Sequence, residues 1–205
     1  MALNFDKETE LEATRRAVAF AEGETVAVTL ERLYDAAPQD VWAALTEPDR
    51  LRAWFSPVTG DLREGGAFQI QGNAGGEILA CERPTWVRMT FGGPESVLDL
   101  TLVAVGVRTA LELRHSVPRA MAGGGAGALY VGPGWDGALM GLALYLRGEE
   151  IGDPAEAANS PEVIEFNKGS IERWVEAVVE SGTATAEALE EARAVSVQQF
   201  TVLPE

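Results

Sequence analysis

His115 is the only histidine in the chain and the residue type best suited to proton transfer. An unperturbed imidazole has a pKa of about 6.5, so it can act as an acid or a base near neutral pH. It closes a strand-like run whose alternate residues share one face: Val107, Thr109, Leu111, Leu113 and His115. On that face His115 would point into an interior cavity near its mouth; the alternative is a satisfied or exposed residue at the end of a strand.

Other polar residues also occur within apolar strand patterns. Asp99 lies between two leucines; facing inward it would anchor a ligand, and facing outward it would be solvent-exposed. Cys81 lies in a strand-like run and is interpreted as a buried structural thiol. Glu112 lies on the opposite strand face from His115, so we expect no hydrogen-bonded pair between them. We interpret Arg88 and Glu112 as charges that face solvent.

The motifs of several enzyme classes are absent from the sequence. It has no G-x-S-x-G nucleophile elbow and no P-loop, and one histidine and one cysteine are too few for a zinc site. Gly132 to Gly137 matches G-x-G-x-x-G, but Asp136 would repel phosphate in the first turn of the helix expected there. We therefore expect no cofactor, metal or catalytic residue, and interpret Asp136 as a favourable charge on the helix dipole.

Composition indicates an acidic cytoplasmic protein. The 205 residues include 16 Lys and Arg against 32 Asp and Glu, a net charge of −16 at pH 7. Such a surface repels phosphate backbones and anionic lipids, so neither nucleic acid nor membrane is an expected partner. The sequence begins without an apolar secretion signal, has no run of ~20 apolar residues, and has one cysteine, which excludes an intramolecular disulfide.

Two short helices are predicted within Ala36 to Phe55. Pro38 and Pro48 suit first helical positions, where a missing N–H costs nothing. Residues at helical spacing then give each helix an apolar face: Val41, Trp42 and Leu45, and Leu51, Trp54 and Phe55. Helices this short are unstable alone, so we expect them to lie on a sheet.

The sheet is predicted to be an antiparallel meander. Turn signals such as Gly65-Gly66, Arg83-Pro84 and Gly106 recur at short spacing, which argues against βαβ units. The expected strands cover residues 25–33, 58–62, 77–82, 86–91, 96–103 and 107–115, with a further strand containing Phe68 and Ile70. Before them, we favour a strand over Ala13 to Phe20 that forms a hairpin with residues 25–33, the alternative being an amphipathic helix over Phe5 to Phe20.

Three segments carry a family resemblance. Ala36 to Phe55, Leu62 to Ile70 (L-R-E-G-G-A-F-Q-I) and Gly76 to Pro84 (G-E-I-L-A-C-E-R-P) resemble the START-like superfamily, also called SRPBCC or helix-grip proteins. Within it, the chain is similar to the branch related to the activator of Hsp90 ATPase homologue, over residues 25–146. The resemblance implies an α+β helix-grip fold, in which a curved antiparallel sheet wraps around a long C-terminal helix, with two short helices after the first strand.

The long helix is expected from Trp135 to Arg147, with Gly148 as its C-terminal cap. Because a curved sheet and a helix touch along only part of their length, such folds leave an apolar cavity, unless side chains fill it as solid core. The predicted cavity residues are Trp54, Phe68, Ile70, Met89, Phe91, Leu111, Leu113, His115, Trp135, Leu139, Leu142, Ala143 and Leu146.

Three functions fit this architecture. We favour binding of a small hydrophobic ligand, held mostly by apolar burial and oriented by His115 and Asp99. The family resemblance also implies a cyclase or dehydratase acting on a polyketide-like substrate, which would need His115 or an inward carboxylate for acid–base catalysis. A co-chaperone-like interaction module is the third, and would need a large exposed apolar patch.

Residues 149–205 extend beyond the short family form. Helices are predicted from Ser160 to Ser181 and from Thr185 to Phe200, and the first carries an apolar stripe from Ile164 to Val178. We expect a helix-grip domain over residues 1–148 and a helical extension over 149–205 that packs on it. The stripe would be buried on the outer sheet, over the cavity entrance, or across a homodimer interface.

Overall fold

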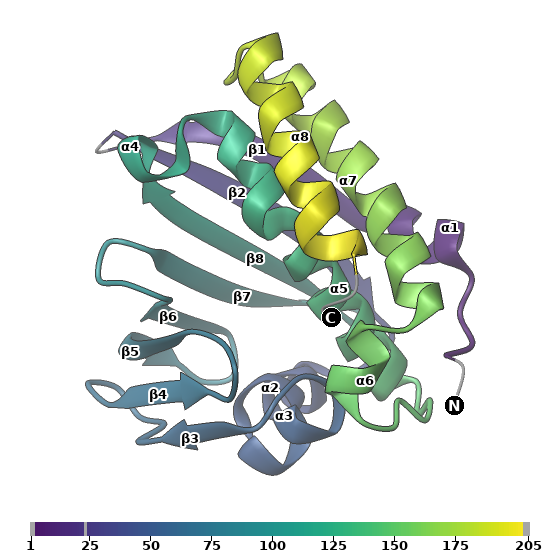
Figure 1. The fold of residues 1–205 in the computed structure, drawn as a ribbon. Coiled ribbons are helices and arrows are strands. Elements are labelled where there is room, and N and C mark those ends of the chain that lie inside the picture. The colour runs from purple at the N-terminus through teal and green to yellow at the C-terminus, as the bar shows by residue number, and fades with distance from the viewer. Residues whose placement is uncertain (1–2, 23, 203–205) are drawn as a thin grey trace.

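One antiparallel sheet with long helices against one face forms the molecule (Figure 1). The computed structural model describes residues 3–22 and 24–202. Neighbouring strands follow the order β1-β2-β8-β7-β6-β5-β4-β3. The strands are β1 (Thr14–Ala21), β2 (Thr25–Tyr34), β3 (Val58–Gly60), β4 (Ala67–Ile70), β5 (Gly75–Glu82), β6 (Trp86–Thr90), β7 (Val97–Val105) and β8 (Arg108–Pro118). This is the predicted α+β helix-grip fold, with its meander of strands after two short helices.

The helices are α1 (Lys7–Glu12), α2 (Pro38–Thr46), α3 (Pro48–Trp54), α4 (Arg119–Ala122), α5 (Ala128–Leu146), α6 (Pro154–Ala158), α7 (Pro161–Ser181) and α8 (Ala186–Thr201), with a 3₁₀ turn η1 (Gly125–Gly127) before α5. The five predicted helices (α2, α3, α5, α7 and α8) occur in the predicted order, and the structure adds three short ones. As predicted, α2 and α3 begin at Pro38 and Pro48. Gly148 follows α5 in the left-handed region (φ 75°), and its N–H donates to the Tyr145 carbonyl at 2.9 Å, which closes the helix as expected.

The N-terminal segment forms the predicted hairpin. β1 pairs with β2 from Thr14 opposite Arg32 to Ala21 opposite Thr25. The alternative helix over residues 5–20 is wrong, because helix α1 ends at Glu12 and the alternating pattern that follows it is satisfied by a strand. Gly23, in the predicted turn, lies outside the described residues. At the other hairpin, Val107 is not part of β8 as expected, but lies in the turn before it and is 89% exposed.

The long helix starts earlier than the sequence predicted. α5 begins at Ala128 instead of Trp135, so the Gly132-Pro133-Gly134 segment lies inside it. Pro133 cannot donate a backbone hydrogen bond and glycine weakens a helix, which is why local propensity placed the start of the helix after this segment. Tertiary contact overrides that propensity. A Cβ on Gly132 would meet the Trp174 ring at 2.3 Å, and one on Gly134 would meet Phe200 at 3.4 Å.

Asp136 is therefore in the middle of a helix and not in its first turn. The expectation that it stabilises the helix dipole is wrong; its side chain is fully buried and accepts hydrogen bonds on Oδ2. The donors are Arg16 Nε at 2.8 Å, Trp174 Nε1 at 2.9 Å and the Ser170 hydroxyl. Burial raises the pKa of Asp136, and these three partners oppose the rise. The cluster ties β1, α5 and α7 together.

The C-terminal helices lie on the same side of the sheet as α5 (Figure 1). α7 contacts α5 and β1, and α8 contacts α5 and α7. Ile171, Trp174 and Val178 from α7 belong to the same buried cluster as the inward residues of the strands. Contact between the extension and the rest of the chain is thus present, and it is made to α5 and to the inner side of β1, not to the outer sheet face. The division at residue 148 stays a prediction.

Candidate functional site

A cavity of about 300 Å³ lies between the sheet, α5 and the two short helices. Its residues come from α2, α3, β3 to β8, the connecting loops and one side of α5. They are Trp42, Leu45, Thr46, Leu51, Trp54, Phe55, Val58, Leu62, Arg63, Glu64, Phe68, Ile70, Ile78, Cys81, Arg83, Val87, Met89, Phe91, Leu98, Leu100, Leu111, Leu113, Trp135, Ala138 and Leu139. Most of these side chains are apolar, so the interior suits an apolar guest.

The two short helices form one end of the cavity. α2 contributes Trp42 and Leu45, and α3 contributes Leu51 and Trp54. Trp54 donates its indole N–H to the Ala44 carbonyl at 3.1 Å, which fixes α3 on α2. This bond leaves the body of the indole free to line the cavity, since its one polar atom is satisfied.

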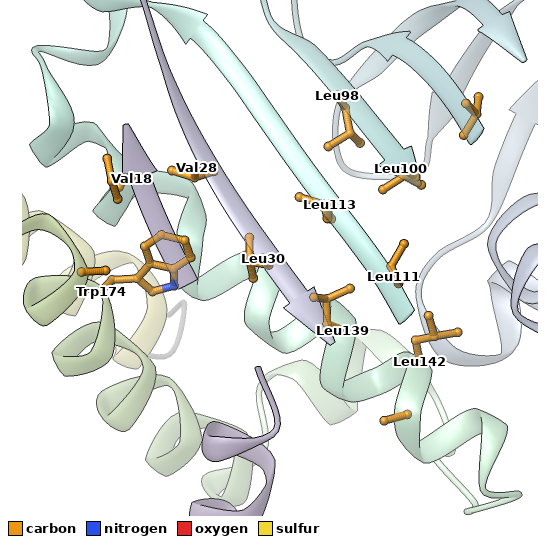
Figure 2. Close-up of a cluster of buried hydrophobic side chains, with 14 of the residues drawn as sticks. Val18, Val28, Leu30, Leu98, Leu100, Leu111, Leu113, Leu139, Leu142 and Trp174 are labelled. Carbon is orange, nitrogen blue, oxygen red and sulfur yellow. The ribbon is translucent and has the colours of Figure 1, made fainter. Parts of the chain in front are cut away.

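Strands β7 and β8 form the floor. Leu100 pairs with Leu113 across the two strands, and Leu102 pairs with Leu111. Figure 2 shows Leu98, Leu100, Leu111 and Leu113 on the helix-facing side of the sheet, together with Leu139 and Leu142 of α5. Period-two alternation places the whole set on one face, as predicted for β8.

The structure brings most of the predicted cavity residues together. Trp54, Phe68, Ile70, Met89, Phe91, Leu111, Leu113, Trp135 and Leu139 all line the cavity. His115, Leu142, Ala143 and Leu146 do not line it. Leu142 and Ala143 are buried, and lie in the main core one helical turn beyond Leu139. Leu98 and Leu100 also line the cavity and were not predicted to, although their alternation around Asp99 was a usable signal.

His115 is buried beside the cavity, with an exposed fraction of 5%. Its ring nitrogens are 2.8 Å from the Ser96 hydroxyl (Nε2) and 3.1 Å from Trp135 Nε1 (Nδ1). The rings of Phe91 and Trp135 pack edge-on against it, with centroids 5.8 and 5.7 Å away, and they line the cavity in its place. The expectation that His115 points into the cavity is therefore wrong.

Trp135 fixes the tautomer of this histidine. An indole N–H can only donate, so Nδ1 accepts and the hydrogen of the neutral ring is on Nε2, which donates to Ser96. Burial lowers the pKa of His115 to about 4, so the ring is neutral at physiological pH. A general base acting on Ser96 would need a free Nε2 lone pair. The hydrogen bond between Ser96 and His115 is thus a structural contact, and the two residues do not form a nucleophile with its general base.

Asp99 faces the opposite side of the sheet. Its carboxylate accepts hydrogen bonds from Arg88 Nε at 2.8 Å, Arg88 Nη2 at 3.1 Å and Trp86 Nε1 at 3.2 Å. The hypothesis that Asp99 orients a ligand is not compatible with this position. Arg88 is half-exposed, as expected for a charge on the outer face. Cys81 is half-buried and lines the cavity.

A second, more open and more polar hollow adjoins the first. The two share Trp42, Thr46, Leu62 and Arg83, and the outer one adds Glu47, Pro48, Gly60 and Asp61. The cavity therefore opens between α2 and two loops, one that joins β3 to β4 and one that joins β5 to β6. Nothing from residues 149–202 lines either hollow.

Within residues 3–22 and 24–202, no group of three or more His, Cys, Asp or Glu side chains is arranged to hold a metal ion. In the same part of the chain, no helix has the length and hydropathy that crossing a membrane requires.

Comparison with known families agrees with this architecture. Residues 35–147 match the family described as "Activator of Hsp90 ATPase homolog 1-like protein". The chain belongs to this family. The matched segment contains α2, α3, β3 to β8 and α5, and so all the elements that form the cavity. The N-terminal hairpin strand β1 and helices α7 and α8 of this activator of Hsp90 ATPase homolog 1-like chain lie outside the match.

Solved structures extend the likeness. The crystal structure of CalU16 from Micromonospora echinospora is 37% identical, covers 81% of this chain and 98% of its own, and has a TM-score of 0.67. EF2215 from Enterococcus faecalis (17% identity, 83% of this chain and 95% of its own, TM-score 0.57) shares the fold alone. So does DynU16, a protein in the dynemicin biosynthetic locus (24% identity, 60% and 48% coverage, TM-score 0.54). No curated protein matches the chain significantly.

Proposed function

We propose that this activator of Hsp90 ATPase homolog 1-like protein binds a small apolar molecule in the cavity. The observation that carries the proposal is a space of about 300 Å³ lined by leucine, isoleucine, methionine and aromatic side chains. Ligand sites in proteins begin at about this volume. Since a water molecule occupies about 30 Å³ in the liquid, the guest would have about ten non-hydrogen atoms inside the protein.

Binding energy would come from burial of the guest's apolar surface, at about 25 cal/mol per Å² before the costs of ordering. The walls are already held by contacts independent of a guest, such as the Trp54–Ala44 and Trp135–His115 hydrogen bonds. A preformed cavity of this kind needs little reorganisation when it is filled.

A cyclase or dehydratase role has less support from this geometry. Acid–base catalysis needs a proton-transferring group within hydrogen-bond reach of the substrate. His115 is separated from the cavity by Phe91 and Trp135, and Asp99 faces the other side of the sheet. The one carboxylate among the lining residues is Glu64, in the loop before β4.

The test is binding of a neutral fluorescent aromatic of about this size, 2-naphthol, to the full chain and to a cavity-filling variant. Ala138 lines the cavity from α5, so Ala138→Phe places six additional carbon atoms inside it. Ala194 is exposed on α8, and Ala194→Phe is the matched control. We expect the wild type and A194F to bind with equal affinity and A138F to bind at least tenfold more weakly.

Equal binding by A138F and A194F, with melting temperatures like the wild type, would contradict the proposal, because the probe would then occupy another surface. An absence of binding by the wild type to this probe and to simple alkanols would contradict it as well.

A further inference from the structure

The charged residues of the cavity gather at one end. The interior faces of β7, β8 and α5 contribute leucines, Trp135 and Ala138, whereas the charges come from Arg63, Glu64 and Arg83. Arg63 and Glu64 lie in the loop before β4, and Arg83 follows β5. Arg83 also lines the outer hollow. A guest therefore meets an apolar interior and one charged rim, so its own polarity must be arranged in the same way.

A β-bulge explains how an arginine reaches this rim. In the β5–β6 ladder, Ile78 pairs with Met89 and Ala80 pairs with Arg88, so Leu79 is the additional residue. The bulge shifts the alternation by one residue, and as a result Ile78 and Cys81 both line the cavity although they are three positions apart. Arg83 lies two residues beyond Cys81 on the same side, at the end of the strand.

The other charges at this rim are mostly paired within the protein. Glu47 accepts a hydrogen bond from Arg50 at 2.8 Å, and Asp61 accepts one from Arg63 at 2.7 Å. Within residues 3–22 and 24–202, Arg83 makes neither an ion pair nor a side-chain hydrogen bond. Glu64 likewise has no ion pair in that part of the chain, but it lines the inner cavity and not the outer hollow.

We infer that Arg83 receives the carboxylate of an amphipathic acid whose apolar body occupies the cavity, an inference that rests on the proposed function. A guanidinium presents parallel N–H donors that match the two oxygens of a carboxylate. The position of Arg83 in both hollows allows its donors to meet a head group at the mouth while the chain of the guest extends toward Leu100 and Leu113. Arg83 is thereby a specificity-determining residue that selects acids over neutral molecules of equal length.

Three ligands of the same chain length test this inference: decanoic acid, 1-decanol and decylamine. Their affinities are measured by calorimetry at about pH 8, where the acid is ionised. We expect the wild type to bind decanoic acid about tenfold more tightly than 1-decanol. In Arg83→Gln this ratio should fall to near one, mainly through weaker binding of the acid.

Arg52→Gln is the control, because it removes one positive charge from an arginine that lines neither hollow and pairs with Asp49. It should keep the wild-type preference.

Equal binding of acid and alcohol by the wild type, or an unchanged ratio in a folded Arg83→Gln variant, would overturn the inference and leave the proposed function intact. Tightest binding of decylamine would also overturn it, and would assign the rim to Glu64. Failure of all three to bind would overturn the proposed function itself, and this inference with it.

Discussion

Gly132 of α5 and Trp174 of α7 are in such close contact that no side chain fits between them. A Cβ atom on Gly132 would lie 2.3 Å from the indole of Trp174, and the same indole donates a hydrogen bond to Asp136 one turn further along α5. The glycine that weakens α5 as an isolated helix is what allows α7 to approach it. The residues that most disfavour a helix locally are thus required by the packing of the whole molecule.

Gly132→Ala should destabilise the protein by about 2 kcal/mol, because the overlap with a rigid indole exceeds the helix-propensity gain of about 1 kcal/mol. Gly137 provides the control. It lies in the same helix, and a Cβ there would have no neighbour within 4 Å, so Gly137→Ala should be neutral or stabilise by up to about 1 kcal/mol. Urea denaturation of both variants gives the comparison. A Gly132→Ala variant as stable as the wild type would show that α7 is not docked this closely.

Arg16→Ala should cost about 3 kcal/mol of unfolding free energy, because it leaves the buried Asp136 carboxylate without its cation. The Arg16 and Asp136 side chains are 6% and 0% exposed. The neighbouring Arg15 pairs with Glu31 on the exposed face of the same strand, so Arg15→Ala should cost no more than about 0.5 kcal/mol.

Chemical denaturation at neutral pH separates these two arginine variants. Equal losses in Arg15→Ala and Arg16→Ala would mean that the ion pair of Arg16 contributes through net charge alone. We expect instead a difference of severalfold between them.

His115 should make stability fall on acidification. Its pKa is lowered to about 4 in the folded chain, against about 6.5 when unfolded. As the pH falls below about 6.5, only the unfolded chain takes up a proton at this site. Stability is therefore lost until about pH 4, where the folded chain is protonated as well. The full effect is about 3 kcal/mol.

The measurement is the difference in unfolding free energy between wild type and His115→Gln, followed from about pH 7.5 to about pH 4.5. Because the two proteins share every other titrating group, their difference isolates the imidazole. The advantage of the wild type should shrink by about 2 kcal/mol over this range. A constant difference would contradict a buried, neutral His115.

Deletion of residues 153–205 should lower the melting temperature by more than 10 °C, at about 2–4 °C per kcal/mol lost, or make the protein aggregate. The deletion removes the buried Phe166, Ile171 and Trp174 and exposes Val18 of β1. Val179→Ala, at an exposed position of α7, is the control for a local change in that helix. A truncated chain with an unaltered melting curve would refute the interdependence of α5, α7 and β1.

Local signals in the sequence predicted most of the fold. Pro38 and Pro48 mark the starts of α2 and α3, and alternation in residues 25–33 and 107–115 identifies inward faces correctly up to the turn at Val107. These signals depend on neighbours along the chain, which is why they can be read without coordinates. The start of α5 could not be predicted in that way, because it depends on the distant Trp174 and Phe200.

The candidate site was harder to predict than the fold. Alternation identifies which residues face inward, but not which of them border the cavity and which pack against α5. Leu139 lines the cavity and Leu142 does not, although both were assigned to the same helix face. The bulge at Leu79 changes which residues of β5 face inward, and the sequence directly around it contains no glycine or other residue typical of a bulge. The partner of Asp136 lies 120 residues earlier in the sequence, beyond the reach of any local pattern.

The first strand and the C-terminal helices cover one another, since α7 packs on β1 on the side of the sheet that also holds α5 (Figures 1 and 2). An edge strand of the sheet and a helix of the opposite layer thus bury one another, although they come from distant parts of the sequence. A relative that lacks β1 should also lack α7 and α8, or should have polar residues on the face that β1 covers here. The converse should hold for a relative that lacks the two helices. During translation, β1 can pair with β2 at once, but the face of β1 that α7 covers stays exposed until α7 has been made.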